Sequence, residues 1–569
     1  MTEKDTIHKL KYLLFEYRGK ILIIIGCLLV SAGLNLCIPL ISKQIMDEGF
    51  LGGDRALLVK LVLLTMGIYV VNSLIDIVKE KKRVDISARL QYGLAEQSFS
   101  HLMRLKISYF NNTNYAEILN NINMDINKIS MIADNSVFFV VTQAFSMIGG
   151  IIGLFIIDYR MTVLVLMFIP AKYIVMKYFA KKQKALMDEC ITVNQKYAAW
   201  FGDTVGGVKE VKTFNLFASK HREFDEKQKF IVDNQKHLYM LTQWNSVTDT
   251  LMIELLSTIL YIVGANMVFD FQLSVGSVFA FITYSAYVTG PISAILNIGY
   301  LLSGIIPSTQ RYYEFMELPE ERDVGEIEDF PLGDLRLDKV CFSYLPDKNI
   351  FDELSITFPQ GQKTAVVGKN GVGKTTLINL LTRLYTPDVG KIYLGDVNIE
   401  EISLSQYRKL FSIVSQQIYL FDGTIRDNIR LDQSVDDHTI YSICCKCGLK
   451  DFIDEVTLDY QVGSNGALLS GGQKQKIALA RALVADTPII ILDEATSNTD
   501  TYSEKQINNL LHKELREKTV IVITHKVDIL KEVDQIVVLR EGKADKVCRY
   551  SEMDGEYWQD NVSETREHH

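Results

Sequence analysis

The sequence lacks the excess of positive charge that proteins binding nucleic acid usually carry. It has 60 lysines and arginines against 69 aspartates and glutamates, which gives a formal net charge of −9 at pH 7. Because the phosphate backbone is held mainly by lysine and arginine, this balance argues against nucleic acid as a partner of the whole chain.

Cysteine is sparse and irregularly placed. The chain has eight cysteines, and two of them, Cys27 and Cys37, lie within an apolar run. A disulfide scaffold is therefore not expected, and a reduced cytosolic environment fits the pattern better. The segment CCKC at 444–447 has no fourth ligand at a usual zinc spacing, so core or surface positions are favoured over a metal site.

Apolar sequence, by contrast, is abundant, and it is concentrated before residue 305. Hydrophobic residues make up 48% of the chain. A helix that crosses a bilayer needs about 20 apolar residues. Six stretches reach or approach that length: Ile21–Ile41, Leu57–Val78, Val137–Ile157, Met161–Met176, Val247–Phe269 and Val275–Leu302. In the fourth, Lys172 lies near the end and could snorkel to the surface. The first has no convincing cleavage site and is interpreted as a retained helix.

The distribution of basic residues predicts how the chain is oriented. The segments KEKKRVD (79–85) and KYFAKKQK (177–184) follow the second and fourth stretches, whereas the loop 43–55 is not enriched in basic residues. The positive-inside rule then places both termini in the cytoplasm and makes the chain a multi-pass protein of the cytoplasmic membrane. The inner connections, about 79–134 and 177–245, show helical spacing, so long helical arms are expected below the membrane.

The pattern changes after residue 316. We predict a transmembrane domain at 1–316, an acidic linker at 317–334 and an α/β P-loop NTPase domain at 335–569. The segment KTAVVGKNGVGKTTLINLL predicts a strand, a glycine-rich loop and a helix, with Gly368, Gly373, Lys374 and Thr375 at the phosphate-loop positions. Backbone N–H groups of such a loop surround phosphates at a helix N-terminus.

Two further strands end in polar residues. IIILDE (489–494) predicts a buried strand that delivers Asp493 to Mg²⁺ and Glu494 to an attacking water molecule. TVIVITH (519–525) ends in His525, which context makes a candidate for the same site. Together with the phosphate loop, these segments predict an enzyme that binds and hydrolyses ATP.

In these motifs and their order, the chain resembles an ATP-binding cassette transporter of the exporter type, a half-transporter with one membrane domain fused to one cassette. The resemblance covers about residues 20–557. It rests on the phosphate loop, Tyr344 in VCFSY, Gln416 in IVSQQIYLF, the signature LSGGQ (469–473), SNTD (497–500) and His525. Ser415 stands where the family usually has proline.

The resemblance implies ATP and Mg²⁺ as cofactors and a second chain as partner, because the signature of one cassette binds the γ-phosphate of ATP held by the other. A homodimer is the simplest assembly, and a heterodimer remains an alternative. The implied catalytic residues are Lys374, Gln416, Glu494 and His525, and the implied Mg²⁺ ligands are Thr375, Gln416 and Asp493. The implied nucleotide-binding residues are Tyr344, Gly368, Asn370, Gly371, Gly373, Lys374, Thr375, Thr376, Ser470, Gly471, Gly472, Gln473 and Asp500.

The family also implies contacts between the membrane domain and the cassettes. Segments 111–122 and 203–214 stand where the coupling helices occur, the first expected to grip the partner cassette, and Arg311 matches the arginine that ends the sixth helix. Before the signature, the family's usual Gly-Glu-Arg-Gly is replaced by residues 463–466, GSNG. The lost charge pair leaves the strength of that contact open.

Polar residues within the apolar stretches indicate where cargo would pass. Polar groups within a membrane are costly and usually face a cavity, which nominates Glu254, Asn35, Asn72 and Asn297 for a substrate pathway. The alternative for Glu254 is a structural pair with a Tyr or Lys of a neighbouring helix. Gly149 and Gly153 are interpreted as helix-packing residues. A bacteriocin-like peptide is slightly favoured as cargo. A multidrug exporter or a lipid flippase is nearly as plausible, and an ATP-gated channel or sensor is the alternative from another class.

Overall fold

A computed structural model describes residues 3–111, 115–133, 135–321, 323–345, 348–494 and 514–553. The side chains of residue 3 and of residues 115–117, 135–137 and 297–303 lie outside this description. Contacts divide the chain into two compact units, Met1–Leu105 with Tyr109–Glu320, and Lys106–Ser108 with Glu321–His569.

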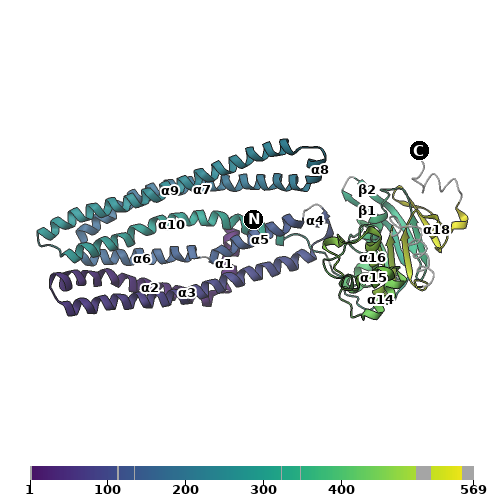
Figure 1. Ribbon diagram of the computed structural model, residues 1–569, viewed down its shortest axis with the longest axis horizontal. Coiled ribbons are helices and arrows are strands. Elements are labelled where there is room, and N and C mark those ends of the chain that lie inside the picture. Colours follow the sequence, from purple (N-terminus) through teal and green to yellow (C-terminus); the bar gives the residue numbers. More distant parts are fainter. Residues whose placement is uncertain are drawn as a thin grey trace. The chain divides into compact units, whose positions relative to one another are not determined.

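The helices between residues 3 and 316, which make up nearly all of the first unit, differ in length, and the long ones run side by side (Figure 1). They are α1 (Glu3–Phe15), α2 (Arg18–Gln44), η1 (Ile45–Leu51), α3 (Arg55–Arg104), α4 (Ile107–Asn111), α5 (Tyr115–Ser130), η2 (Met131–Ala133), α6 (Asn135–Ile157), α7 (Tyr159–Gly206), α8 (Val208–Thr213), α9 (Phe217–Phe269) and α10 (Val275–Met316). Within the described residues, six helical segments are long and apolar enough to cross a membrane, and each contains or closely overlaps one predicted stretch. The polytopic helical fold is confirmed.

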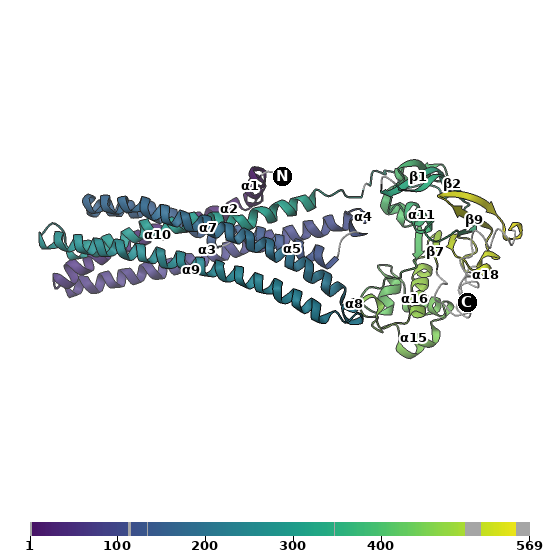
Figure 2. The same ribbon diagram turned by 90° about the horizontal axis from the view of Figure 1, so that it is seen from above.

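Three of these helices are far longer than a membrane crossing requires. α3, α7 and α9 have 50, 48 and 53 residues, which at 1.5 Å per residue is roughly 70–80 Å. The hydrocarbon core is about 30 Å thick, so more than half of each helix continues beyond it, as the helical spacing of the inner connections predicts. α8 forms the short turn at the tip where α7 meets α9 (Figures 1 and 2).

Side-chain caps fix where the helices begin after tight connections. The Asp158 carboxylate accepts hydrogen bonds from the backbone N–H groups of Arg160 and Met161 and so starts α7 directly after α6. Asp54 caps α3 and Ser274 caps α10 in the same way. Each cap satisfies backbone donors that the first helical turn leaves unpaired.

Glycines on α6 permit close packing of the helices, as the sequence predicts. A Cβ atom at Gly150 would lie 2.9 Å from Val288, and one at Gly153 would lie 2.6 Å from the Tyr284 ring. At Gly149 a Cβ would overlap the side chain of Leu36. α6 therefore contacts both α2 and α10 at these three positions.

A buried ion pair joins the helices around Lys172. Its side chain is fully buried, and its Nζ lies 2.7 Å from Oδ1 of Asp249 on α9. Ser293 of α10 donates a hydrogen bond to the same oxygen over 2.8 Å. The expectation that Lys172 snorkels to the surface is therefore wrong. The lysine faces the bundle interior, where a carboxylate from a neighbouring helix compensates its charge.

This pair yields a test of stability. We expect Asp249→Asn to lower the free energy of unfolding by about 3–5 kcal/mol, because it leaves the buried Lys172 charge without a counter-charge. Replacing both partners, Lys172→Met with Asp249→Leu, should recover most of the loss. The measurement is the unfolding temperature of the purified protein in detergent.

Glu254→Gln is the matched control, because Glu254 is an exposed carboxylate on the same helix. It should leave the unfolding temperature nearly unchanged. Equal losses in the Asp249 variant and this control would contradict the compensating role of Asp249.

The second unit contains two β-sheets. The four-stranded antiparallel sheet has the order β2-β1-β4-β5, and the six-stranded sheet has the order β10-β9-β3-β8-β7-β6, parallel except for the β9–β10 pair. The strands are β1 (Leu335–Leu345), β2 (Lys348–Phe358), β3 (Lys363–Val367), β4 (Val389–Leu394), β5 (Val397–Asn398), β6 (Phe411–Val414), β7 (Ile489–Asp493), β8 (Thr519–Ile523), β9 (Gln535–Arg540) and β10 (Lys543–Cys548).

Helices cover these sheets and form a subdomain of their own. In the described part of this unit the α-helices are α11 (Lys374–Leu381), α12 (Leu404–Arg408), α13 (Ile425–Arg430), α14 (Asp437–Lys446), α15 (Lys450–Val456), α16 (Gly471–Val484) and α18 (Val527–Leu530), and the short 3-10 helices are η3 (Ile399–Glu401), η4 (Ser464–Gly466) and η5 (Tyr550–Glu552). Figure 2 shows α15 and α16 on one side of the unit and β1 and β2 on the other. Every residue of β7 and β8 is buried, which explains their unbroken Ile, Val and Leu runs.

The cysteines of CCKC belong largely to the core of this helical subdomain. Cys444 and Cys447 are 0% and 1% exposed and pack among apolar side chains of α13, α14 and α16. Burial raises the pKa of the Cys444 thiol to about 12. Thiols in such surroundings are packing residues rather than reactive groups.

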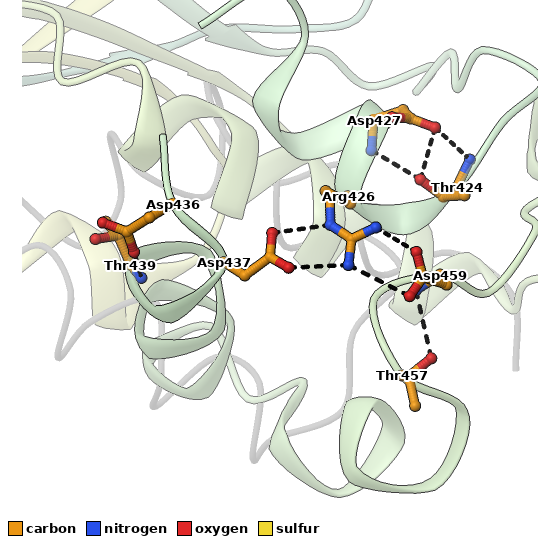
Figure 3. A network of polar contacts seen from close by, with 8 residues as sticks. All are labelled: Thr424, Arg426, Asp427, Asp436, Asp437, Thr439, Thr457 and Asp459. Carbon is orange, nitrogen blue, oxygen red and sulfur yellow. Dashed lines mark hydrogen bonds and ion pairs between the residues drawn. The ribbon is translucent and has the colours of Figure 1, made fainter. Parts of the chain in front are cut away.

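An arginine ties the subdomain together at its surface (Figure 3). Arg426 donates two hydrogen bonds to Asp437 at the start of α14, and it also pairs with Asp459 on the loop after α15. Thr424 and Asp427 form a capping box at the start of α13. The network fixes the segment that leads from α15 toward the signature.

Candidate functional site

The phosphate loop lies between β3 and α11. Gly371 and Gly373 have φ values of 82° and 108°, a backbone conformation that side chains with a Cβ rarely adopt. A Cβ at Gly373 would also lie 2.9 Å from the Phe351 ring. Glycine is therefore required where the loop turns into the helix, and the N–H groups of the first helical turn face an anion site.

Lys374 and His525 meet at this loop. The Lys374 Nζ donates a hydrogen bond to the Gly368 carbonyl oxygen over 2.7 Å and lies 3.0 Å from Nε2 of His525. β3 and β8 are adjacent parallel strands, so the residues that follow them come out at the same edge of the sheet. Lys374 and His525, which are 151 residues apart in the sequence, therefore lie next to each other at this edge.

Gln416 and Glu494 meet at the ends of the next two strands. The Gln416 Nε2 donates a hydrogen bond to Oε2 of Glu494 over 2.7 Å. Glu494 has a φ of 48°, and its N–H donates to the Ile523 carbonyl oxygen over 3.0 Å. A non-glycine residue in this conformation is held there by its surroundings, which is common at functional sites.

Asp493 precedes Glu494 and is the buried member of the acidic pair, with 8% of its surface exposed. Burial and, to a lesser extent, the neighbouring Glu494 charge raise its pKa, the Lys374 charge lowers it, and the net result is a pKa of about 6. A carboxylate that is costly to ionise when alone is well suited to a cation.

The candidate Mg²⁺ ligands supply oxygen donors of the right kind. Thr375 offers a hydroxyl, Gln416 an amide oxygen and Asp493 a carboxylate, and Mg²⁺ prefers such hard oxygen ligands. Thr375 is exposed at the start of α11, whereas Asp493 is buried beneath the same edge. The residues present therefore fit the ion.

Tyr344 lies at the end of β1, with 45% of its surface exposed. Its hydroxyl donates a hydrogen bond to Oγ1 of Thr376 over 3.2 Å and accepts one from Nδ2 of Asn379 over 3.3 Å. The aromatic ring is thereby attached to the helix that begins at the phosphate loop. Asn379 was not a candidate from the sequence, although its place one turn beyond Thr376 on α11 offered a signal.

The signature residues form the start of α16. The Ser470 hydroxyl accepts a hydrogen bond from the Gln473 N–H, and the Gln473 side chain accepts one from the Ser470 N–H, over 3.3 and 2.8 Å. Among the described residues, no atom outside the adjoining residues and the backbone of α16 lies within 4 Å of a Cβ placed on Gly471 or Gly472, so this part of the structure leaves the turn open beside both glycines. In the preceding GSNG segment, Asn465 has a φ of 49°, and its carbonyl oxygen accepts a hydrogen bond from Lys474 Nζ over 2.8 Å. Asp500 lies outside the described residues.

The polar candidates of the membrane domain fall into different environments. Asn72 donates a hydrogen bond to Asn35 over 2.9 Å and accepts one from Ser31, so these residues join α2 and α3. Glu254 is exposed, and no ion pair joins it to another described side chain. Asn297 lies on α10, and its side chain is not among those described.

Arg311 has a partner that the sequence did not indicate. Both its Nε and Nη2 donate to the carboxylate of Asp125 on α5, over 3.1 Å for the Nε contact. Asp125 is 5% exposed. The candidate segment 203–214 forms the end of α7 and α8, while 112–114 of the other segment lie outside the described residues.

Comparisons with known proteins define the class. Residues 21–292 match the model of the ABC transporter transmembrane region, and residues 351–497 match the model of the ABC transporter. The chain is therefore a multi-pass membrane protein with an ATPase domain. It belongs to the ATP-binding cassette transporters, as a half-transporter of the exporter type in which ATP hydrolysis is coupled to transport.

Relatives of full length support this assignment. The chain is 27% identical to an uncharacterized ABC transporter ATP-binding protein, YfiC, of Bacillus subtilis, over 95% of this chain and 90% of the relative. It is 26% identical to an ATP-dependent lipid A-core flippase of Escherichia coli K12, over 92% and 91%. The fold resembles that of a bacterial Atm1-family ABC exporter with ATP bound, with a TM-score of 0.82, 21% identity and coverage of 95% and 97%.

The raised pKa of Asp493 predicts a pH dependence. The folded cassette holds the Asp493 proton more tightly than the unfolded chain does, so this group's contribution to stability falls as the pH rises from 3.8 to about 6. We expect Asp493→Asn to stabilise the nucleotide-free protein at pH 7.5 by at most roughly 3 kcal/mol. The advantage should shrink toward pH 5.

Calorimetry of the purified protein measures this, with the cassette transition identified by its response to ATP in the wild type. Asp528→Asn is the control, because the Asp528 side chain is 75% exposed; it should change little at either pH. An Asp493→Asn variant less stable than the wild type at pH 7.5 would refute the interpretation.

Proposed function

We propose that two copies of the chain associate and clamp two ATP molecules between their cassettes, and that this drives export across the cytoplasmic membrane. The proposal rests chiefly on one observation: Lys374, Gln416, Glu494 and His525 converge at one edge of the parallel sheet. Ser470, by contrast, starts a different helix whose turn is open beside Gly471 and Gly472. An open N–H turn at a helix N-terminus suits a phosphate brought by another molecule.

Each polar residue has a role that follows from its position. Lys374 and the backbone of the phosphate loop hold the β- and γ-phosphates, and His525 next to Lys374 contacts the γ-phosphate. Glu494 accepts the proton of the attacking water, and Gln416, bonded to Glu494, orients that carboxylate. Thr375, Gln416 and Asp493 would hold Mg²⁺, which when bound neutralises charge that develops on the phosphates.

The two-chain arrangement explains how ATP drives movement. A ligand shifts a conformational equilibrium only when it binds one state more tightly than the other. ATP that touches both cassettes favours the closed state, and hydrolysis removes that preference. The intact residue set supports a homodimer with two competent sites, and a heterodimer with a second half-transporter is the alternative, distinguished by native mass measurement.

The membrane domain supplies the pathway and the cargo preference. We place both termini in the cytoplasm. Glu254, exposed on a membrane-length helix, is assigned to the pathway, where its negative charge favours a cationic group on the cargo.

Five of the relatives compared carry the name ATP-dependent lipid A-core flippase, at 26–27% identity over nine-tenths or more of this chain. This similarity makes an amphipathic lipid the leading cargo. A peptide is the second candidate, on the resemblance of residues 493–507, DEATSNTDTYSEKQI, to bacteriocin and peptide exporters.

A variant of the base tests the catalytic assignment. We expect Glu494→Gln to bind ATP with near-normal affinity, to accumulate as a closed dimer and to lose turnover by a factor of 100 or more, roughly the contribution of a positioned general base. ATPase rates and size measurement with ATP provide the readouts. Hydrolysis at the wild-type rate would show that Glu494 is not the base.

Lys374→Ala serves as the contrasting variant. It removes the charge beside the phosphates, so nucleotide binding itself should be lost, and no closed dimer should form with ATP. Undiminished affinity in this variant would argue against the role of the phosphate loop.

The cargo is tested in liposomes of defined composition. We expect one class among lipids, peptides and cationic drugs to stimulate ATPase activity, and Glu254→Gln to reduce stimulation by cationic members of that class. Unchanged stimulation and an unchanged cargo range in this variant would remove Glu254 from the pathway. Uphill accumulation in inverted vesicles separates a pump from an ATP-gated channel.

A further inference from the structure

Three aromatic rings meet at Tyr344, which by the family resemblance is the aromatic residue that stacks on adenine. The Tyr344 ring lies 4.9 Å from that of Phe342 and 5.1 Å from that of Tyr385, centroid to centroid, with interplanar angles of 87° and 90°. Phe342 and Tyr385 are 5.6 Å apart at 70°. Aromatic pairs favour such nearly perpendicular arrangements. Two rings on different segments therefore restrict how far the Tyr344 ring can rotate.

Tyr385 lies on the connection between α11 and β4. Asp388 on the same connection forms hydrogen bonds with residues of β1 that precede Tyr344. The Asp388 carboxylate accepts hydrogen bonds from the N–H and hydroxyl of Ser343, over 2.8 and 3.1 Å. The Asp388 N–H in turn donates to the Cys341 carbonyl oxygen over 2.9 Å. Ser343 directly precedes Tyr344, so both the ring and the backbone of Tyr344 are held from this connection.

The hydroxyl end of Tyr344 is held from a third direction. Thr376 and Asn379 of α11 bond to it, and α11 begins at the phosphate loop. Tyr344 nevertheless keeps 45% of its surface exposed. An aromatic ring that is restrained on several sides and still exposed is suited to stack on a planar ligand group without a large loss of side-chain freedom.

We infer that Tyr385 and Asp388 are positioning residues for nucleotide binding, which orient Tyr344 relative to the phosphate loop so that base and phosphates are bound in register. The inference rests on the proposed ATP-binding function and on the role of Tyr344 as the platform for adenine, which the family resemblance implies. Neither residue reaches the phosphates in this assignment. Base stacking is the same in the ground state and the transition state, so its loss raises KM and leaves kcat unchanged.

The experiment is the steady-state ATPase activity of the full-length protein in liposomes. We expect Tyr385→Ala to raise the KM for ATP roughly 2- to 10-fold, the range for one aromatic pair, with kcat changed less than twofold. Tyr385→Phe keeps the ring and should restore a KM near that of the wild type. Asp388→Ala should shift KM in the same direction as Tyr385→Ala.

Tyr393→Ala is the matched control, because Tyr393 lies on β4 with its ring against Arg336 and outside the three-ring cluster. It should leave KM and kcat unchanged. If Tyr385→Ala unfolds the cassette, Tyr385→Leu, which retains apolar volume, provides the measurement. An unchanged KM in a folded Tyr385 variant, or a fall in kcat alone, would overturn the inference.

A double-mutant cycle separates this inference from the proposed platform. If Tyr385 acts through Tyr344, adding Tyr385→Ala to Tyr344→Ala should raise KM no further. Additive effects would show that Tyr385 acts independently and would overturn the inference alone. A Tyr344→Ala variant with the wild-type KM would instead refute the platform, and the inference with it.

Discussion

Parallel pairing of four strands is the constraint on which the ATP site depends. β6, β7, β8 and β3 run in the same direction in one sheet, so the residues that follow them leave from a single edge. That edge receives Gln416, Asp493 with Glu494, His525 and Lys374 from segments spread over more than 100 residues. The two central strands of this set, β7 and β8, are buried at every residue. The chemistry depends on this geometry, because each role requires a distance near 3 Å.

The membrane domain meets a different physical demand. Helices in lipid cannot associate through exclusion of water, so contact is achieved by small residues and by polar pairs. Gly149, Gly150 and Gly153 allow α6 to approach α2 and α10, and the Lys172–Asp249 pair connects α7 with α9. Together these contacts hold α6 against α2 and α10, and α7 against α9. The positive charge of Lys172 on α7 is compensated by the negative charge of Asp249 on α9, inside the bundle.

The boundary between the two units carries charged contacts on both sides of one peptide bond. Glu320 belongs to the first unit, where it pairs with His101 and Arg104 of α3, and these contacts hold its pKa below the usual range. Glu321 belongs to the second unit, where it pairs with Arg408 of α12. Each unit thus holds its own end of the connection through ion pairs within that unit.

Much of this protein follows from local sequence. Short-range patterns predict the six apolar helices, the glycine-rich loop before a helix and the acidic pair after a buried strand. They can do so because helix length, backbone freedom and strand burial depend on residues close together in the sequence. The partners of Lys172 and Arg311, and the contact of Tyr385 with Tyr344, could not be predicted in this way. They join residues that lie far apart in the chain or that carry no distinctive neighbours. The packing of helices and strands sets the directions of the side chains. Only this packing determined that Lys172 pairs with Asp249, that Arg311 pairs with Asp125 and that the Tyr385 ring packs against Tyr344.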